Sequence, residues 1–216
     1  MSPRDRIARF SWGERALHWL LAASFLTMLA TGLMMSVPAF SGLVARPVAK
    51  AAHLDAALAL AAGVVLLAAV HGRRLRATLR QLDRFDRDDL AWLRRIPARL
   101  VGRRRPAPPQ GRFNAGQKLN AATVGGLMVV AYVTGGLLWL GERDTTYRLA
   151  GTVKVHDAVM WLMVLLVSAH VYMAVMHHDT RESLPGMVRG SVDREWARHH
   201  HAKWVHDDEV SGPGGS

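Results

Sequence analysis

Four histidines stand inside or at the edges of long apolar segments of the sequence: His18, His53, His156 and His170. An imidazole in such a place can ligate a metal, relay a proton or hydrogen-bond to a neighbouring helix, and ionisable residues inside a membrane usually mark function. His156 and His170 are fourteen residues apart, which on one α-helix separates them by about 40° in azimuth and about 21 Å along the axis. One helix face therefore offers imidazoles at two depths.

The distribution of charge predicts the elements that carry these histidines. Charge-free runs cover 16–45, 56–72, 119–141 and 158–178. A hydrocarbon core about 30 Å thick needs roughly 20 apolar helical residues. Three of these runs are long enough. The second run, 56–72, becomes long enough when Ala51–Leu54 are included and Asp55 lies near a membrane interface. We predict an all-α integral membrane protein, a four-transmembrane-helix bundle with spans of about 12–37, 51–72, 116–141 and 154–178.

The first apolar run is too long for the apolar region of a signal peptide, which covers 7–15 residues. It is preceded by Ser11-Trp12-Gly13-Glu14, the S-x-x-E pattern of a capping box. We therefore expect a retained helix that begins near Trp12.

The basic residues predict the orientation of the spans. Of 28 Lys and Arg, 23 lie in 1–15, 72–118 and 177–216, and five lie in 37–52 and 141–155. The positive-inside rule puts the larger group in the cytoplasm, together with both termini, a basic loop (73–115) and a polar tail (179–216). The net charge of +11 is then a topology signal, and no nucleic-acid partner is expected.

Depth and topology predict two pairs among the four histidines. His53 opens the second span on the outer side, level with His156, and His18 lies about two turns into the first span on the inner side, level with His170. We call His53 and His156 the outer pair, and His18 and His170 the inner pair. Two facing imidazoles would give a six-coordinate haem iron suited to electron transfer. Gly32, on the His18 face at outer depth, either admits a haem edge or packs helices.

Cysteine is absent from the sequence, which excludes disulfides, iron–sulfur ligation, thiolate zinc sites and c-type haem attachment. Any haem is therefore non-covalent. The remaining histidines are predicted to be interfacial (His71, His177, His178) or part of a solvated tail (His199, His200, His201, His206).

Several stretches resemble the gamma (cytochrome b) subunit of membrane-bound formate dehydrogenase, a family related to hydrogenase and thiosulfate-reductase b-type cytochromes. The matching residues are Arg9–Arg15, His18-Trp19, Arg112–Lys118, His170–Ala174, Gly186-Met187, Gly190, Trp196-Ala197, His199-His200 and Trp204. The resemblance covers nearly the whole chain, so we expect one di-haem cytochrome b membrane domain over 1–216.

The resemblance implies two haem b groups, held by the outer pair and the inner pair. It also implies an iron–sulfur subunit and a molybdenum- or tungsten-containing catalytic subunit as partners, and a place in the bacterial inner membrane. Quinone would bind near the inner haem, at Asn114 and Gly116, with Arg112 and Lys118 favouring anionic intermediates. The residues alone favour a simpler interpretation, in which 112–118 is the polar entry to the third span and Asn114 is its N-cap.

The basic inner loop carries 14 Lys and Arg and four Asp over 72–118. Apolar residues among these charges predict one or two short helices in the head-group layer, and 103–109 is predicted to form a stiff turn. The loop suits contact with anionic membrane lipid or a partner protein, and equally a solvated topology signal.

The sequence thus predicts a di-haem cytochrome that passes electrons from a formate dehydrogenase complex to quinone and does not oxidise formate by itself. One alternative is the equivalent subunit of a hydrogenase or another oxidoreductase. Another is a haem-free membrane anchor or a proton carrier that uses Asp55, Asp157 and the histidines.

Overall fold

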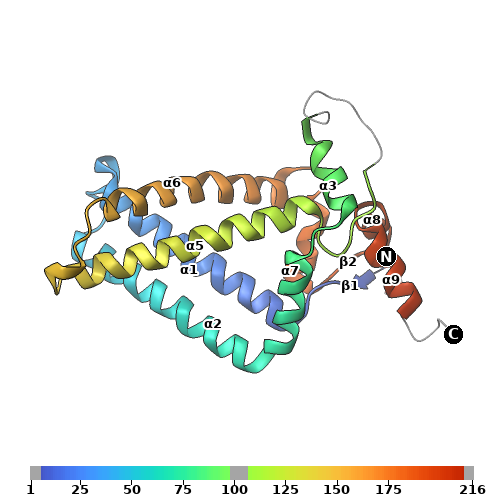
Figure 1. Ribbon diagram of the computed structural model, residues 1–216, viewed down its shortest axis with the longest axis horizontal. Coiled ribbons are helices and arrows are strands. Elements are labelled where there is room, and N and C mark those ends of the chain that lie inside the picture. Colours follow the sequence, from blue (N-terminus) through green and yellow to red (C-terminus); the bar gives the residue numbers. More distant parts are fainter. Residues whose placement is uncertain (1–5, 98–106, 212–216) are drawn as a thin grey trace. The chain divides into compact units, whose positions relative to one another are not determined.

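The computed structural model describes residues 6–97 and 107–211 (Figure 1). Its residues pack into two compact units, described here separately. The apolar unit consists of 16–72 and 123–172. The polar unit consists of the described residues within 1–15, 73–122 and 173–216.

The long helices are α1 (Trp12–Ser36), α2 (Arg46–Asp83), α5 (Ala115–Gly141) and α6 (Thr152–Val171), the last continued by a π-helical turn, η4 (Tyr172–Met176). Within the described residues, these four are long and apolar enough to cross a membrane. The predicted fold class is confirmed, with boundaries close to those predicted for the first, third and fourth spans. A short 3-10 helix lies in the connection between α1 and α2, η2 (Pro38–Phe40), and another in that between α5 and α6, η3 (Thr145–Tyr147).

Two helix boundaries follow directly from local chemistry. At the start of α1, the backbone N–H of Ser11 donates to Glu14 Oε2 over 2.8 Å, so the predicted capping box is confirmed. The second helix extends well beyond the predicted 51–72, in both directions. Residues 73–83 contain neither Gly nor Pro and consist mostly of Arg and Leu, which favour helix, so the helix continues past the apolar run.

The polar unit is built around a small sheet that joins both ends of the chain. Strand β1 (Arg6–Ala8) pairs antiparallel with β2 (Ser191–Asp193), Ile7 opposite Val192. The surrounding short helices are α3 (Arg87–Arg94), η5 (Arg181–Ser183), α7 (Leu184–Arg189), α8 (Arg194–His200) and α9 (Ala202–Ser211). The buried core consists of Ile7, Val192, Trp196, Ala197 and Val205.

The prediction of a solvated tail over 179–216 is wrong for its described part. Apolar residues in this segment are too widely spaced to predict a core, and they become one only through pairing with β1. In the basic loop, one predicted short helix is present as α3, capped by Asp86. The predicted turn at 103–109 falls largely on 98–106, outside the described residues.

Candidate haem sites and the surrounding residues

The outer pair comes together in the apolar unit. His53 of α2 and His156 of α6 have ring centroids 6.2 Å apart, at an interplanar angle of 62°. Each ring also meets a threonine hydroxyl: Thr31 Oγ1 lies 3.0 Å from His53 Nδ1, and Thr134 Oγ1 lies 2.8 Å from His156 Nδ1. The two imidazoles are therefore contacted by hydroxyl groups of the neighbouring helices α1 and α5.

The inner pair shows the same ring separation without the same support. His18 of α1 and His170 of α6 have ring centroids 6.2 Å apart, with the rings inclined at 53°. His18 Nδ1 is buried and has no hydrogen-bond partner among the described residues. The Trp19 indole lies beside the His18 ring, with centroids 5.2 Å apart and the rings nearly perpendicular at 88°.

The spacing of both pairs fits a metal between them. A bond from a metal to an imidazole nitrogen is about 2 Å long and the nitrogen lies about 1 Å from its ring centroid, so two imidazoles on one metal have centroids about 6 Å apart. The measured 6.2 Å in each pair agrees with this value. Each pair could thus hold the iron of a haem through two imidazole nitrogens.

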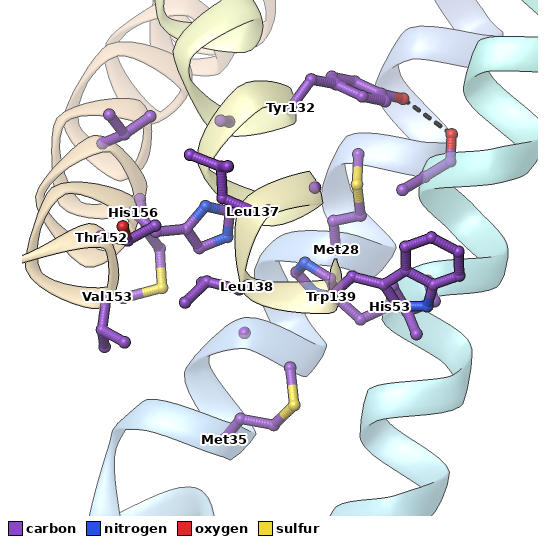
Figure 2. A pocket seen from close by; sticks show the side chains of 18 of the residues that line it. Met28, Met35, His53, Tyr132, Leu137, Leu138, Trp139, Thr152, Val153 and His156 are labelled. Atoms are coloured by element: carbon purple, nitrogen blue, oxygen red, sulfur yellow. Dashed lines mark hydrogen bonds between the residues drawn. The ribbon is translucent and has the colours of Figure 1, made fainter. Parts of the chain in front are cut away.

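A cavity of about 910 Å³ surrounds the outer pair. Figure 2 shows the rings of His53 and His156 entering it from α2 and α6. Its walls are mainly apolar and rich in flexible methionines: Met28, Met35, Met128, Met160 and Met163. A largely apolar cavity of this size is what a bulky, flat cofactor requires.

Two glycines line this cavity beside the histidines. Gly32 lies at the level of His53, and an added Cβ there would be 3.7 Å from His53 Cε1, an ordinary contact. At Gly135, which the sequence reasoning missed, an added Cβ would be 3.3 Å from His156 Cε1. An added side chain would therefore have less room beside its histidine at Gly135 than at Gly32.

Charged side chains line the same cavity: Arg46, Lys50, Glu142, Arg148 and Asp157. Arg46 and Arg148 donate to backbone carbonyls, and Lys50 forms an ion pair with Glu142. With three cations against two carboxylates, these residues could bind the acidic side chains of a haem. Asp55, the other carboxylate considered for a proton relay, is exposed and does not line the cavity.

This geometry agrees with the comparison with known proteins. A family described as prokaryotic cytochrome b561 matches residues 9–190 of the chain. The chain belongs to this family. It is therefore a multi-pass bacterial membrane protein, and membership of a cytochrome b family implies haem b.

Curated relatives of this cytochrome carry a more specific description. Over 212 residues, the chain is 24% identical to the cytochrome b556(Fdn) subunit of the nitrate-inducible formate dehydrogenase of Escherichia coli K12, covering 97% of this chain and 94% of the relative. It is 26% identical to the cytochrome b556(fdo) subunit of formate dehydrogenase from the same strain, over 96% and 95% of the two chains. The chain is also 24% identical to a formate dehydrogenase cytochrome b556 subunit of Haemophilus influenzae, and the match covers 98% of this chain and 87% of the relative.

The residues predicted to bind quinone lie in the polar unit. Asn114 is the N-cap of α5: its Oδ1 accepts the N–H of Gln117 at 2.9 Å, and its own N–H donates to Gln117 Oε1 at 3.1 Å. The Asn114 NH₂ group has no hydrogen bond within the described part of the chain. Trp92 of α3 packs against Gly116, where an added Cβ would be 3.0 Å from Trp92 Cη2.

The two cations expected to favour a charged quinone are already paired within this cytochrome. Arg112 forms a buried ion pair with Glu14, which also accepts from Thr78. Lys118 Nζ lies 2.6 Å from Asp89 Oδ2 and is 9% exposed. Their charges are compensated by carboxylates of the same unit, so the expected effect on an anionic quinone is weak.

His201 corrects the prediction of a solvated histidine run. His199 and His206 are exposed as predicted, but His201 is 1% exposed. Its Nδ1 donates to the carbonyl of Gly111 at 2.7 Å, and its Nε2 accepts from Arg9 at 3.0 Å. A carbonyl only accepts and a guanidinium only donates, so this ring is neutral with its hydrogen on Nδ1.

Electrostatics support a neutral His201. Burial, and after it the positive charge of Arg9, lowers the pKa of His201 to about 3. Burial and the charge of Arg112 likewise lower the pKa of Arg9 to about 9, so Arg9 remains charged at neutral pH. The Arg9 guanidinium is stabilised by the ring faces of Phe10, Trp196 and Trp204, at 5.1–5.7 Å from their centroids.

Proposed function

We propose that this chain is the di-haem b-type cytochrome subunit of a formate dehydrogenase complex and passes electrons through the outer pair, then the inner pair, to quinone. The observation that carries the proposal is the presence of two histidine pairs, each with ring centroids 6.2 Å apart, in one four-helix unit. The near full-length similarity to formate dehydrogenase cytochrome b556 subunits supports the choice of complex.

The residues of each site would hold a haem in a state suited to electron transfer. When bound, a haem carries one electron by cycling between ferric and ferrous iron. His53 and His156 would hold the haem iron at the outer site, and His18 and His170 would hold it at the inner site. Two imidazole ligands at each site would favour electron transfer over oxygen binding. Arg46 and Arg148 would bind the haem carboxylates at the outer site.

The direction of electron flow follows from the proposed orientation. The 23 to five distribution of basic residues supports cytoplasmic termini and places the outer pair towards the opposite face. Electrons would arrive there from an iron–sulfur subunit, itself supplied by a molybdenum- or tungsten-containing catalytic subunit. His156 and His170, one residue of each pair, are about 21 Å apart along α6, so the two proposed sites lie at different depths on the route inward.

A spectrum of the purified complex tests this proposal. Reduced-minus-oxidised spectra should show b-type haem, reduced by formate in the presence of the partner subunits. Reduction by hydrogen in place of formate would assign the chain to the alternative complex, a hydrogenase. Purified chain with no b-type absorbance would contradict the proposal and favour a haem-free anchor or proton carrier.

Quinone reduction is proposed at Asn114 and Gly116, and the support is the free amide of Asn114. The carboxamide NH₂ can donate to a quinone carbonyl while Oδ1 caps α5. We expect Asn114→Ser, which keeps a capping oxygen but loses the NH₂ group, to slow quinol formation while both haems remain reducible. Asn114→Asp is the companion variant, since it also caps without donating. Unchanged quinone kinetics in both would show that Asn114 only caps the helix.

A further inference from the structure

The hydroxyls of Thr31 and Thr134 contact the outer pair in the same way. Thr31 Oγ1 lies 3.0 Å from His53 Nδ1 and 2.7 Å from the carbonyl oxygen of Thr27. Thr134 Oγ1 lies 2.8 Å from His156 Nδ1 and 2.7 Å from the carbonyl oxygen of Val130. Each hydroxyl therefore stands between a helix carbonyl and an imidazole nitrogen.

The hydrogen count assigns the direction of these bonds. A hydroxyl has one hydrogen, and a carbonyl oxygen can only accept, so each threonine donates to the carbonyl one turn earlier in its own helix. Its oxygen is then left to accept, and the matching donor is the N–H at Nδ1 of the histidine. In this tautomer, Nε2 carries the lone pair that a metal requires.

The arrangement is repeated in the two halves of the bundle. The dipeptides Thr31-Gly32 and Thr134-Gly135 each precede their histidine by the same spacing, with Thr and His separated by 22 residues in both cases. In each half, the glycine lies against the Cε1 edge of the same ring. One residue thus offers an acceptor at Nδ1 and the next leaves room for the ring, and the repetition marks a built feature rather than a chance contact.

The inner pair has no such support. His18 Nδ1 is buried without a hydrogen-bond partner among the described residues, and no described residue hydrogen-bonds to His170. A hydrogen bond accepted from the far nitrogen of a ligating imidazole makes the ligand more electron-donating and stabilises the more highly charged metal. The two pairs are thus chemically unequal despite their equal ring separation.

We infer that Thr31 and Thr134 are positioning residues that hold the outer pair in the Nδ1–H tautomer and lower the reduction potential of the outer haem below that of the inner haem. This inference rests on the proposed function, because it concerns a one-electron transfer from outer to inner haem. In that transfer the ferrous outer iron would lose one electron and the ferric inner iron would gain it, and no proton is involved. The hydroxyls make the transfer favourable in the direction of the cytoplasmic face.

Redox titration of the purified complex, with each haem followed by its own spectrum, tests this inference. In the Thr31→Val and Thr134→Val double variant, we expect the midpoint potential of the outer haem to rise while that of the inner haem stays unchanged. Thr→Ser at both positions should restore the wild-type value, since serine keeps the hydroxyl. Thr27→Val is a matched control, because Thr27 also donates to a carbonyl of its own helix, that of Ala23, but has no hydrogen bond to a histidine within the described part of the chain.

Each outcome decides the question. Loss of the outer haem alone in the valine variant, restored by serine, also supports a positioning role. Unchanged potentials in the valine variant, equal shifts of both haems, or the same change in Thr27→Val would overturn the inference. A wild-type complex without haem would instead refute the proposed function, so the two failures are distinguishable.

Discussion

The two units of this cytochrome bury different kinds of polar side chain. In the apolar unit, the buried polar residues are hydroxyl-bearing: Ser24, Thr31, Thr134 and Thr152. In the polar unit, charged and amide groups and a histidine are buried: Arg9, Glu14, Asp89, Gln110, Lys118 and His201. A hydroxyl can be satisfied within its own helix, as Thr31 is by the Thr27 carbonyl, whereas a buried charge needs a partner from elsewhere.

The difference teaches how each unit is stabilised. Helices in lipid must satisfy their backbone polar groups internally. In the apolar unit the buried hydroxyls do this within their own helices, so the histidines are not needed to hold the helices together and can bind a cofactor. The polar unit joins distant segments through buried pairs, such as Glu14 with Arg112 and Asp89 with Lys118. Substitutions should therefore change the cofactor in one unit and stability in the other.

The largest effect is expected from the histidine pairs. If the proposed ligation is right, His156→Ala should remove the outer haem and spare the inner one, and His170→Ala should do the reverse, because each variant loses one of the two imidazoles that would hold that haem. Pyridine haemochrome content and the low-temperature spectrum would measure this. His206→Ala, at an exposed position, is the control. The pairing is wrong if His53→Ala and His18→Ala remove the same haem.

A large loss of stability is expected in the polar unit from Asp89→Ala. This change leaves Lys118 buried without its carboxylate, which costs about 3–5 kcal/mol. Glu209→Ala breaks exposed ion pairs with Arg194 and Arg198, which solvent screens, and should lower stability much less. Thermal unfolding midpoints would compare the two variants. Equal midpoints would show that the Asp89–Lys118 pair does not support the unit.

Acidification should weaken the polar unit through His201. The folded-state pKa is about 3, below the ordinary value near 6.5, so the unfolded chain takes up a proton first as the pH falls. Stability should decrease between pH 6.5 and 3 by up to about 1.4 kcal/mol per pH unit. His201→Gln keeps a donor for Gly111 and an acceptor for Arg9 but does not titrate. Denaturation across this range should show that the stability of His201→Gln depends less on pH than that of the wild type. An equal pH dependence in the two proteins would contradict a buried, neutral His201.

The smallest effect is expected at two adjacent glycines of α5. An added Cβ at Gly135 would be 3.3 Å from His156 Cε1, whereas one at Gly136 meets nothing within 4 Å. Gly135→Ala should displace the imidazole by a few tenths of an ångström and slightly shift the spectrum of the outer haem. Gly136→Ala should leave both haem spectra unchanged. A shift in the second variant alone would contradict the described packing.

Local patterns of the sequence predicted the apolar unit well. The four spans follow from runs of uncharged residues, and the start of α1 follows from the Ser11 and Glu14 capping box. The pairing of histidines required only helix rise and topology, and the structure places both pairs at 6.2 Å. Haem count and quinone binding stay predictions.

The polar unit was largely beyond sequence reasoning. The pairing of β1 with β2 joins residues separated by about 185 positions, and three-residue strands carry no periodic signal. His201 resembled its exposed neighbours because nothing local distinguishes it. The one available signal for Thr31 and Thr134 was the repeated Thr-Gly dipeptide at equal spacing from a histidine, which is recognisable only once the helices are paired.

The sequence by itself determined the number of spans, their predicted orientation and the depths of the four histidines, because lipid imposes length and charge rules on single helices. Only the tertiary structure decided which histidine nitrogens meet a threonine hydroxyl. It also decided which charges are buried in pairs and that the end of the chain forms a core with its beginning. These features depend on contacts between distant segments, whose geometry no local pattern encodes.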